Sequence, residues 1–122
     1  MKSDDRELDL RTELTRMPLL PVLVLDDVAQ AERMVRCLLD QDVRVAEITL
    51  RTPRALDILT HLSRHYPALT VGAGTVRSIG DVDRALVAGA QFAVSPGLDA
   101  DMLAHARLRG MPLVPGVMTP GE

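Results

Sequence analysis

Aromatic side chains are almost missing from this sequence of 122 residues. They make up 2% of it, as Tyr66 and Phe92, and there is no tryptophan. Hydrophobic residues as a whole reach 47%, so the core must be built from leucine, valine, alanine, isoleucine and methionine. Such a core favours helices packed on a β-sheet. The shortage of rings disfavours a surface on which nucleic-acid bases would stack.

Positive charge, lysine and cysteine are also scarce. The net charge is −3, and no basic patch is visible, so we expect no nucleic-acid partner. All but one of the 14 basic residues are arginines spread along the chain, and the single lysine is Lys2. Cys37 has no second cysteine with which to form an internal disulfide. This fits a reducing compartment, and we expect a cytoplasmic protein.

Long hydrophobic runs are absent. The longest, residues 17–25, contains two prolines and is too short to span a membrane, so we expect no membrane partner. Residues 1–17 carry nine charges of both signs and no apolar run, which excludes a secretion signal. We predict that they form a charged N-terminal arm, with a short helix carrying Leu10 and Leu14.

From residue 18 onward, a unit of strand, turn and amphipathic helix repeats. The predicted strands are 19–25, 43–50, 69–73, 92–95 and 112–115, and the predicted helices start at the capping residues Asp27, Thr52, Ser78 and Asp99. Alternating units of this kind predict parallel strands covered by helices. A doubly wound sheet and a (β/α)₈ TIM barrel both fit. The even spacing and the small residues after each strand favour the α/β barrel.

The last four residues, Thr119-Pro-Gly-Glu122, have the pattern of a capping box that opens a further helix. About four and a half units do not close a barrel, and the fifth strand would remain an unpaired edge. We therefore expect residues 18–122 to be the N-terminal portion of a TIM-barrel domain in a longer protein. The alternative is that the last residues form a C-terminal loop.

The strand at residues 43–50 carries the most informative side chains. Alternation places Glu47, Thr49 and Arg51 on one face, at the end of the strand where barrels gather functional residues. A carboxylate in a partly dry pocket can act as a general base, and an arginine can clamp a substrate carboxylate through paired hydrogen bonds. On spacing alone, ion pairs with neighbouring strands explain Glu47 and Arg51 equally well.

Two further strand ends and one pair of histidines carry residue types found in functional sites. Gly72-Ala-Gly-Thr75 predicts either a tight strand exit with positive φ or a close backbone approach to a small ligand, with the Thr75 hydroxyl as a donor. Pro96 most often shapes a turn. His61 and His65 lie four apart on one helix without a third ligand nearby, so we predict a surface pair and no metal site.

Four segments together resemble the 2-keto-3-deoxy-6-phosphogluconate (KDPG) aldolases, a family that includes 4-hydroxy-2-oxoglutarate (KHG) aldolase. They are Val45-Ala-Glu-Ile-Thr-Leu-Arg-Thr52, Val71-Gly-Ala-Gly-Thr-Val76, Gln91-Phe-Ala-Val-Ser-Pro-Gly97 and Pro115-Gly-Val-Met-Thr-Pro-Gly-Glu122. They follow the order and spacing of that family from about residue 18 to the end, and as a set they are specific.

The resemblance implies a class I lyase of the Entner–Doudoroff pathway, usually a homotrimer, which needs no cofactor. It would cleave 2-keto-3-deoxy-6-phosphogluconate to pyruvate and glyceraldehyde 3-phosphate, so the partners would be a small keto acid and a phosphorylated aldehyde. By the same resemblance, Glu47 would be the acid/base, Arg51 and Thr75 would bind the pyruvate carboxylate, and Pro96 would line the pocket.

The sequence departs from the family in two respects. The family's Schiff-base lysine belongs to the sixth strand, beyond Glu122, and Lys2 in the charged arm cannot replace it. The phosphate site expected after strands seven and eight of such a barrel is missing as well. We therefore expect aldolase activity of the full-length protein and none from this chain alone. The alternative function is a non-catalytic half-barrel that binds small keto acids or assembles with a partner chain. A metal-dependent keto-acid aldolase or decarboxylase would need a ligand cluster that the sequence does not show.

Overall fold

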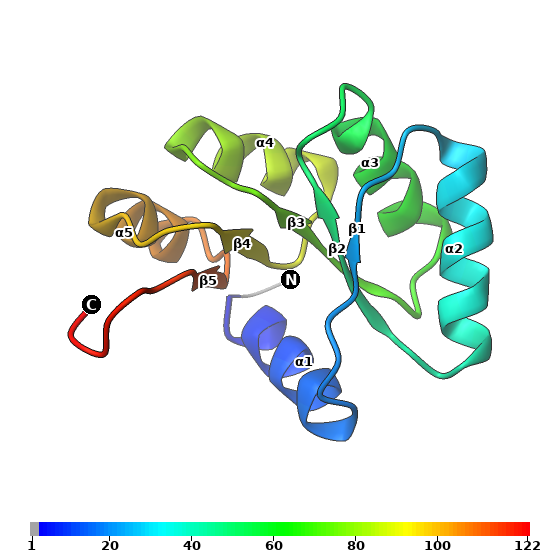
Figure 1. The fold of residues 1–122 in the computed structure, drawn as a ribbon, viewed down its shortest axis with the longest axis horizontal. Coiled ribbons are helices and arrows are strands. Elements are labelled where there is room, and N and C mark those ends of the chain that lie inside the picture. The colour runs from blue at the N-terminus through cyan, green and yellow to red at the C-terminus, as the bar shows by residue number, and fades with distance from the viewer. Residues whose placement is uncertain (1–2) are drawn as a thin grey trace.

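Residues 3–122 of the protein are described by a computed structural model (Figure 1), with side chains from residue 5 onward; Lys2 lies outside them. Five parallel strands form one sheet in the order of the chain: β1 (Val22–Leu23), β2 (Val45–Thr49), β3 (Thr70–Gly74), β4 (Ala93–Ser95) and β5 (Leu113–Pro115). A doubly wound sheet reverses its strand order at a switch point. The uninterrupted order seen here is that of a (β/α)₈ barrel.

The helices divide between the two faces of the sheet. Their bounds are α1 (Ser3–Arg16), α2 (Val28–Asp40), α3 (Ala55–His65), α4 (Ile79–Ala88) and α5 (Ala100–Leu108). The helices α2 to α5 form an arc on one side of the sheet, and α1 lies on the other (Figure 1). Among the described residues, no helix is long and apolar enough to cross a membrane.

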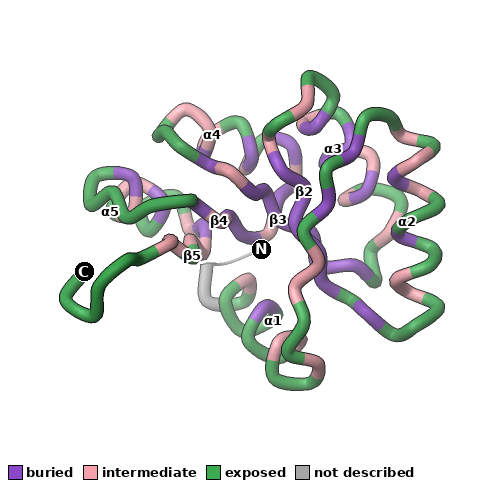
Figure 2. The backbone as a smooth tube through the Cα atoms, in the orientation of Figure 1, coloured by how far each residue is buried: buried purple, intermediate pink, exposed green. Residues whose placement is uncertain are grey.

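Both faces of β2 are covered by protein. All five of its residues are buried (Figure 2). Ala46 and Ile48 belong to the large core between the sheet and the helices α2 to α5. On the other face, Val45 packs in a smaller cluster with Leu10 of α1 and Phe92. The polar side chains of β2 on this second face are therefore enclosed by protein.

The N-terminal arm contains the predicted helix. It runs for 14 residues as α1, and Leu10, on its inner side, is buried. Arg6 Nη1 donates a 3.0 Å hydrogen bond to the Gly110 carbonyl, 104 residues further along the chain. The arm is thus joined to the turn between α5 and β5.

Three of the four predicted helix starts are confirmed. Asp27, Ser78 and Asp99 each accept a hydrogen bond from the backbone N–H three residues later, at 2.7, 3.0 and 3.0 Å. These bonds satisfy donors that a first helical turn leaves free. Asp27 followed three residues later by Gln30 is also the pattern of a capping box. The Gln30 side chain does not complete it, because it accepts from the N–H of Asp26, at 2.9 Å.

The predicted cap at Thr52 is wrong. The helix α3 begins at Ala55 after a turn, with Arg54 at the capping position and no side-chain cap. The Thr52 hydroxyl donates instead to the Leu25 carbonyl at 2.8 Å. It therefore joins the turn after β2 to the segment after β1.

The first strand is shorter than predicted and covers only Val22–Leu23. Pro21, directly before it, has no N–H with which to donate to a ladder.

The last four residues form a turn, in which the Glu122 carboxylate accepts from the Thr119 N–H and hydroxyl, both at 3.1 Å. The bond from the Thr119 N–H is the contact that the predicted capping box requires. The residues 119–122 themselves are not helical.

Candidate active site

A small pocket of about 120 Å³ lies at the carboxyl ends of the strands. It is lined by Val22, Glu47, Thr49, Arg51, Thr75, Val94, Ser95 and Pro96. The four residues predicted for the site, Glu47, Arg51, Thr75 and Pro96, all lie in this lining. They come from β2, from the turn after β2 and from the segments after β3 and β4, so the parallel topology brings them together.

Glu47 is the buried acidic group of the pocket. It pairs with Gly72 of β3 and Val22 of β1 in the sheet, and only 6% of its surface is exposed. Burial raises the pKa of its carboxyl group, while the positive charge of Arg51 acts in the opposite direction. A carboxylate whose pKa is raised in this way is a stronger general base than one at its ordinary pKa.

Room for the Glu47 carboxylate comes from Gly74. A Cβ atom at that position would overlap Glu47 Oε2. At Gly72, a Cβ atom would overlap the ring of Phe92. These two glycines therefore give space to neighbouring side chains, and neither has the positive φ that the sequence suggested for this strand exit.

The positive φ occurs one residue later, at Thr75, with a value of 57°. Left-handed backbone is uncommon for a β-branched residue and typical of functional sites. In this conformation, the Thr75 hydroxyl accepts a 3.2 Å hydrogen bond from Arg51 Nε.

Arg51 lies in the turn after β2, since the strand ends at Thr49. Its side chain is exposed and lines the pocket. If the strand continued to Arg51, that residue would lie roughly 13 Å from Glu47 along it. Because the turn intervenes, that spacing does not set their separation, and the charge of Arg51 acts on Glu47.

Sequence reasoning assigned no role to Thr49 and Ser95, which also line the pocket. Ser95 is satisfied locally, because its hydroxyl donates to the Gly97 carbonyl at 2.9 Å. Thr49 is 1% exposed, and its hydroxyl has no hydrogen-bond partner among the described residues. The signal that could have identified Thr49 is its place between Glu47 and Arg51 in the alternation of β2.

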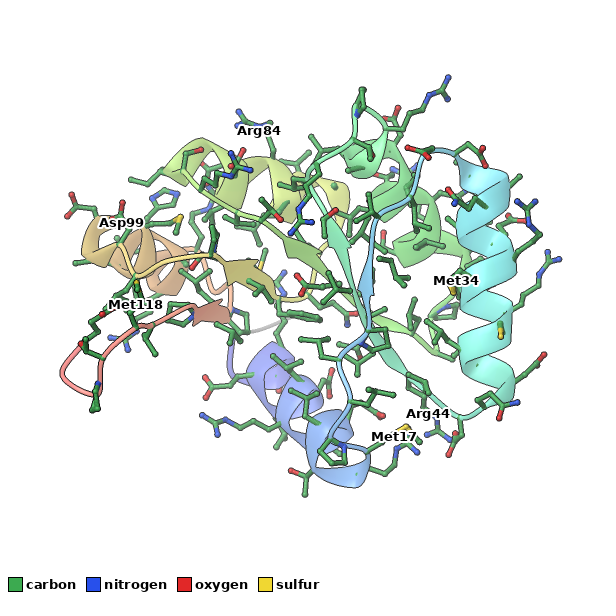
Figure 3. All side chains as sticks on the ribbon, in the orientation of Figure 1. Met17, Met34, Arg44, Arg84, Asp99 and Met118 are labelled. Carbon is green, nitrogen blue, oxygen red and sulfur yellow. The ribbon has the colours of Figure 1, made fainter. Side chains whose placement is uncertain are left out.

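Several charged groups outside the pocket form hydrogen bonds or ion pairs with one another. His61 Nε2 lies 2.7 Å from Glu32 Oε1 and joins α3 to α2, and the hydrogen bond to His61 lowers the pKa of Glu32. The rings of His61 and His65 stack with centroids 4.2 Å apart. Within the described part of the chain, no three metal-binding side chains gather. Arg44 and Arg84 point away from the sheet (Figure 3) and pair with exposed or partly exposed aspartates.

A larger cavity, of about 610 Å³, separates α1 from α5 and β5. Its walls are mainly aliphatic, with Leu14, Leu103 and Val114 among them. Its charged residues stand on the exposed faces of the helices, and it contains no buried acid or base. The small pocket is therefore the candidate active site.

Comparison with known proteins identifies the family. The family model of the KDPG and KHG aldolases matches residues 10–122. The chain belongs to this aldolase family. Its KHG/KDPG aldolase relative from Escherichia coli is 40% identical over 109 residues, which cover 89% of this chain and 51% of the relative.

Solved structures of KDPG aldolases share the fold. The Zymomonas mobilis enzyme, solved with 3-phosphoglycerate, matches 93% of this chain and 54% of its own with a TM-score of 0.85 and 39% identity. The Legionella pneumophila enzyme, solved with pyruvate captured as a covalent carbinolamine, matches 85% of this chain and 50% of its own, with a TM-score of 0.81 and 36% identity. The chain thus has the TIM-barrel type of fold of these aldolases and spans about half the length of the relatives that it matches.

Proposed function

We propose that the protein carrying this chain is a class I KDPG aldolase, which cleaves 2-keto-3-deoxy-6-phosphogluconate to pyruvate and glyceraldehyde 3-phosphate. The observation that carries the proposal is the pocket itself. In a chain of the aldolase family, a buried Glu47 with a raised pKa shares one small pocket with the hydrogen-bonded pair of Arg51 and Thr75.

The roles follow from the chemistry of a 2-oxo acid. Arg51 binds the carboxylate of the pyruvate moiety through its outer N–H groups, a charge-assisted contact, while Thr75 holds the guanidinium from behind. Glu47 moves protons at the carbon next to the carbonyl and at the hydroxyl of the bond that breaks. Pro96 closes the wall of the pocket.

We propose that the group that accepts the electron pair of the broken bond is not part of residues 1–122. A lysine amine forms an imine with the keto carbon, and the imine accepts the electron pair when the carbon–carbon bond breaks. The lysine in residues 1–122 is Lys2 of the arm, to which we assign no such role. We propose that the required lysine and the phosphate-binding loops belong to residues that follow Glu122 in the natural protein.

The remaining properties of the whole protein are likewise proposals. We assign residues 1–17 to the arm and 18–122 to the N-terminal portion of the barrel domain. The assembled protein would be a cytoplasmic homotrimer that acts on a small keto acid and a phosphorylated aldehyde. It would use no cofactor or metal and would have no nucleic-acid or membrane partner.

Borohydride trapping tests the proposal. Chain 1–122 and the protein at its natural length would each be incubated with pyruvate and sodium borohydride and then analysed by intact mass spectrometry. We expect a reduced pyruvate adduct on the natural-length protein and none on chain 1–122. An adduct on chain 1–122 would refute the assignment of the lysine. No adduct on the natural-length protein would refute class I chemistry.

A second candidate is a non-catalytic half-barrel that binds keto acids or assembles with a partner chain. The edges of the sheet favour it, because β1 and β5 each pair on one side only and Val22 and Val114 are 55% and 44% exposed. A stop codon directly after Glu122, together with pyruvate binding and no lyase activity, would select this candidate.

A further inference from the structure

Thr49 has a buried hydroxyl group that the proposed reaction has not yet used. The residue is 1% exposed and lines the pocket. Its Oγ1 atom finds no hydrogen-bond partner within the described chain. Burying an unpaired hydroxyl is unfavourable, and nearly all buried polar side chains have a partner.

The fold itself gives no reason for a threonine at this position. Thr49 pairs with Gly74 in the sheet, and a valine would have the same shape and the same preference for a strand. Its neighbour Ile48, which faces the large core, shows that β2 otherwise uses aliphatic side chains where packing alone matters. The hydroxyl therefore points to a partner that enters the pocket.

We propose that the Thr49 hydroxyl donates a hydrogen bond to the C2 oxygen of a bound 2-oxo acid and so selects ligands with an oxygen at that carbon. This inference rests on the proposed function. Thr49 is the last residue of β2, about 7 Å from Glu47 along the strand direction. Arg51 follows in the turn, and all three side chains line the pocket. The C2 oxygen is the polar atom between the carboxylate that Arg51 binds and the carbon at which Glu47 moves a proton.

The test compares two ligands and two variants. Oxamate has a carboxylate and a C2 oxygen but does not form imines, and propionate has the carboxylate without the C2 oxygen. Affinities of both would be measured by calorimetry on the natural-length protein as wild type, Thr49→Val and Thr49→Ser. Valine removes the hydroxyl at constant shape, while serine keeps it.

We expect Thr49→Val to weaken oxamate binding about tenfold, the effect of losing one buried hydrogen bond to a ligand, and to leave propionate binding unchanged. Thr49→Ser should bind oxamate within about twofold of wild type, a change smaller than one hydrogen bond. Equal losses for both ligands, or no loss for oxamate, would overturn the role of Thr49. If wild type binds neither ligand, the proposed function fails instead.

Thermal unfolding of the unliganded protein gives a second readout. An unpaired buried hydroxyl that is replaced by a methyl group costs no stability, so Thr49→Val should melt at or above the wild-type temperature. A melting temperature several degrees lower would show that the hydroxyl has a structural partner, and the inference would be withdrawn.

Discussion

The Glu47 side chain fills the space that a Cβ atom on Gly74 would need. Gly74 is the last residue of β3, and Glu47 lies on the neighbouring strand β2. The position of the carboxylate in the pocket thus depends on a missing methyl group across the sheet. This relationship explains a glycine for which the sequence suggested a turn.

Gly74→Ala should therefore displace Glu47. We expect a loss of at least about 100-fold in the rate of lyase turnover, comparable to the loss of a general base. The free energy of unfolding should fall by about 1–3 kcal/mol because of overpacking. Gly97→Ala is the matched control, since a Cβ atom there meets nothing within 4 Å. Full activity of Gly74→Ala would show that the Glu47 carboxylate can act from a second position in the pocket.

Glu47→Gln should raise the stability of the protein near pH 7 and lower its activity. Burial holds the pKa of Glu47 above its ordinary value of 4.5, so the folded protein binds this proton more tightly than the unfolded chain. The contribution of Glu47 to the free energy of unfolding therefore falls as pH rises through the interval above 4.5.

The glutamine variant removes this dependence. It should melt higher than wild type near pH 7 and lose that advantage as the pH falls below 4.5, where Glu47 is protonated in both the folded and the unfolded wild-type chain. Exchange of the pyruvate methyl protons with deuterium, followed by NMR, should fall by about 10²–10⁴-fold. A variant that melts lower near pH 7 would mean that the ionised carboxylate stabilises the fold.

Arg51→Ala should weaken binding of the 2-oxo acid. Loss of a charge-assisted contact to the carboxylate predicts a rise in KM of about 10–100-fold. It should also move the acidic limb of the pH–rate profile to higher pH, since the charge of Arg51 opposes the rise in the pKa of Glu47. Arg54→Ala, in the same turn and exposed, is the control. If both variants shift the profile equally, the effect is one of net charge and not of the site.

Gly72→Ala should destabilise the inner cluster. A Cβ atom there overlaps the Phe92 ring, which predicts a cost of about 1–3 kcal/mol in urea unfolding. Phe92→Leu would free part of that space. The double variant should thus be less destabilised than the sum of the two single variants, by about 0.5 kcal/mol or more. If the two free-energy costs simply add, the backbone at residue 72 must move to relieve the overlap, while the ring of Phe92 stays in place.

Leu10→Ala tests whether α1 stabilises the sheet. Leu10 is 5% exposed against Val45 and Phe92, and its truncation should cost about 2–4 kcal/mol. Leu8→Ala on the same helix removes a side chain that is 62% exposed and should change stability by less than about 0.5 kcal/mol. Similar values for both variants would mean that α1 packs only loosely on the sheet.

The features that were predicted correctly from the sequence depend on residues close together in the chain. The caps at Asp27, Ser78 and Asp99 depend on atoms three residues apart, and the repeat of strand and helix depends on hydrophobic spacing. Where a partner lies far along the chain, prediction failed. Thr52 has the local pattern of a cap, but its hydroxyl bonds to Leu25, 27 residues earlier.

The same difference between local and distant partners applies to the candidate site. Alternation along one strand was enough to place Glu47 on an enclosed face, and the strand-end rule for barrels led to Thr75 and Pro96. The hydrogen bond between Arg51 and Thr75 joins residues 24 apart, and the unpaired hydroxyl of Thr49 is visible only when every neighbour is in place. Neither could be predicted from the sequence, because both depend on how strands and turns pack.

The bond between Arg6 and the Gly110 carbonyl has a consequence for the order of synthesis. The helix α1 leaves the ribosome before its partners Phe92 and Gly110, and the Gly110 carbonyl is made 104 residues after Arg6. At about 5–20 residues per second, α1 waits roughly 5–20 seconds with Leu10 exposed. During this interval the nascent chain presents an amphipathic helix without its sheet, which makes it a target for chaperones.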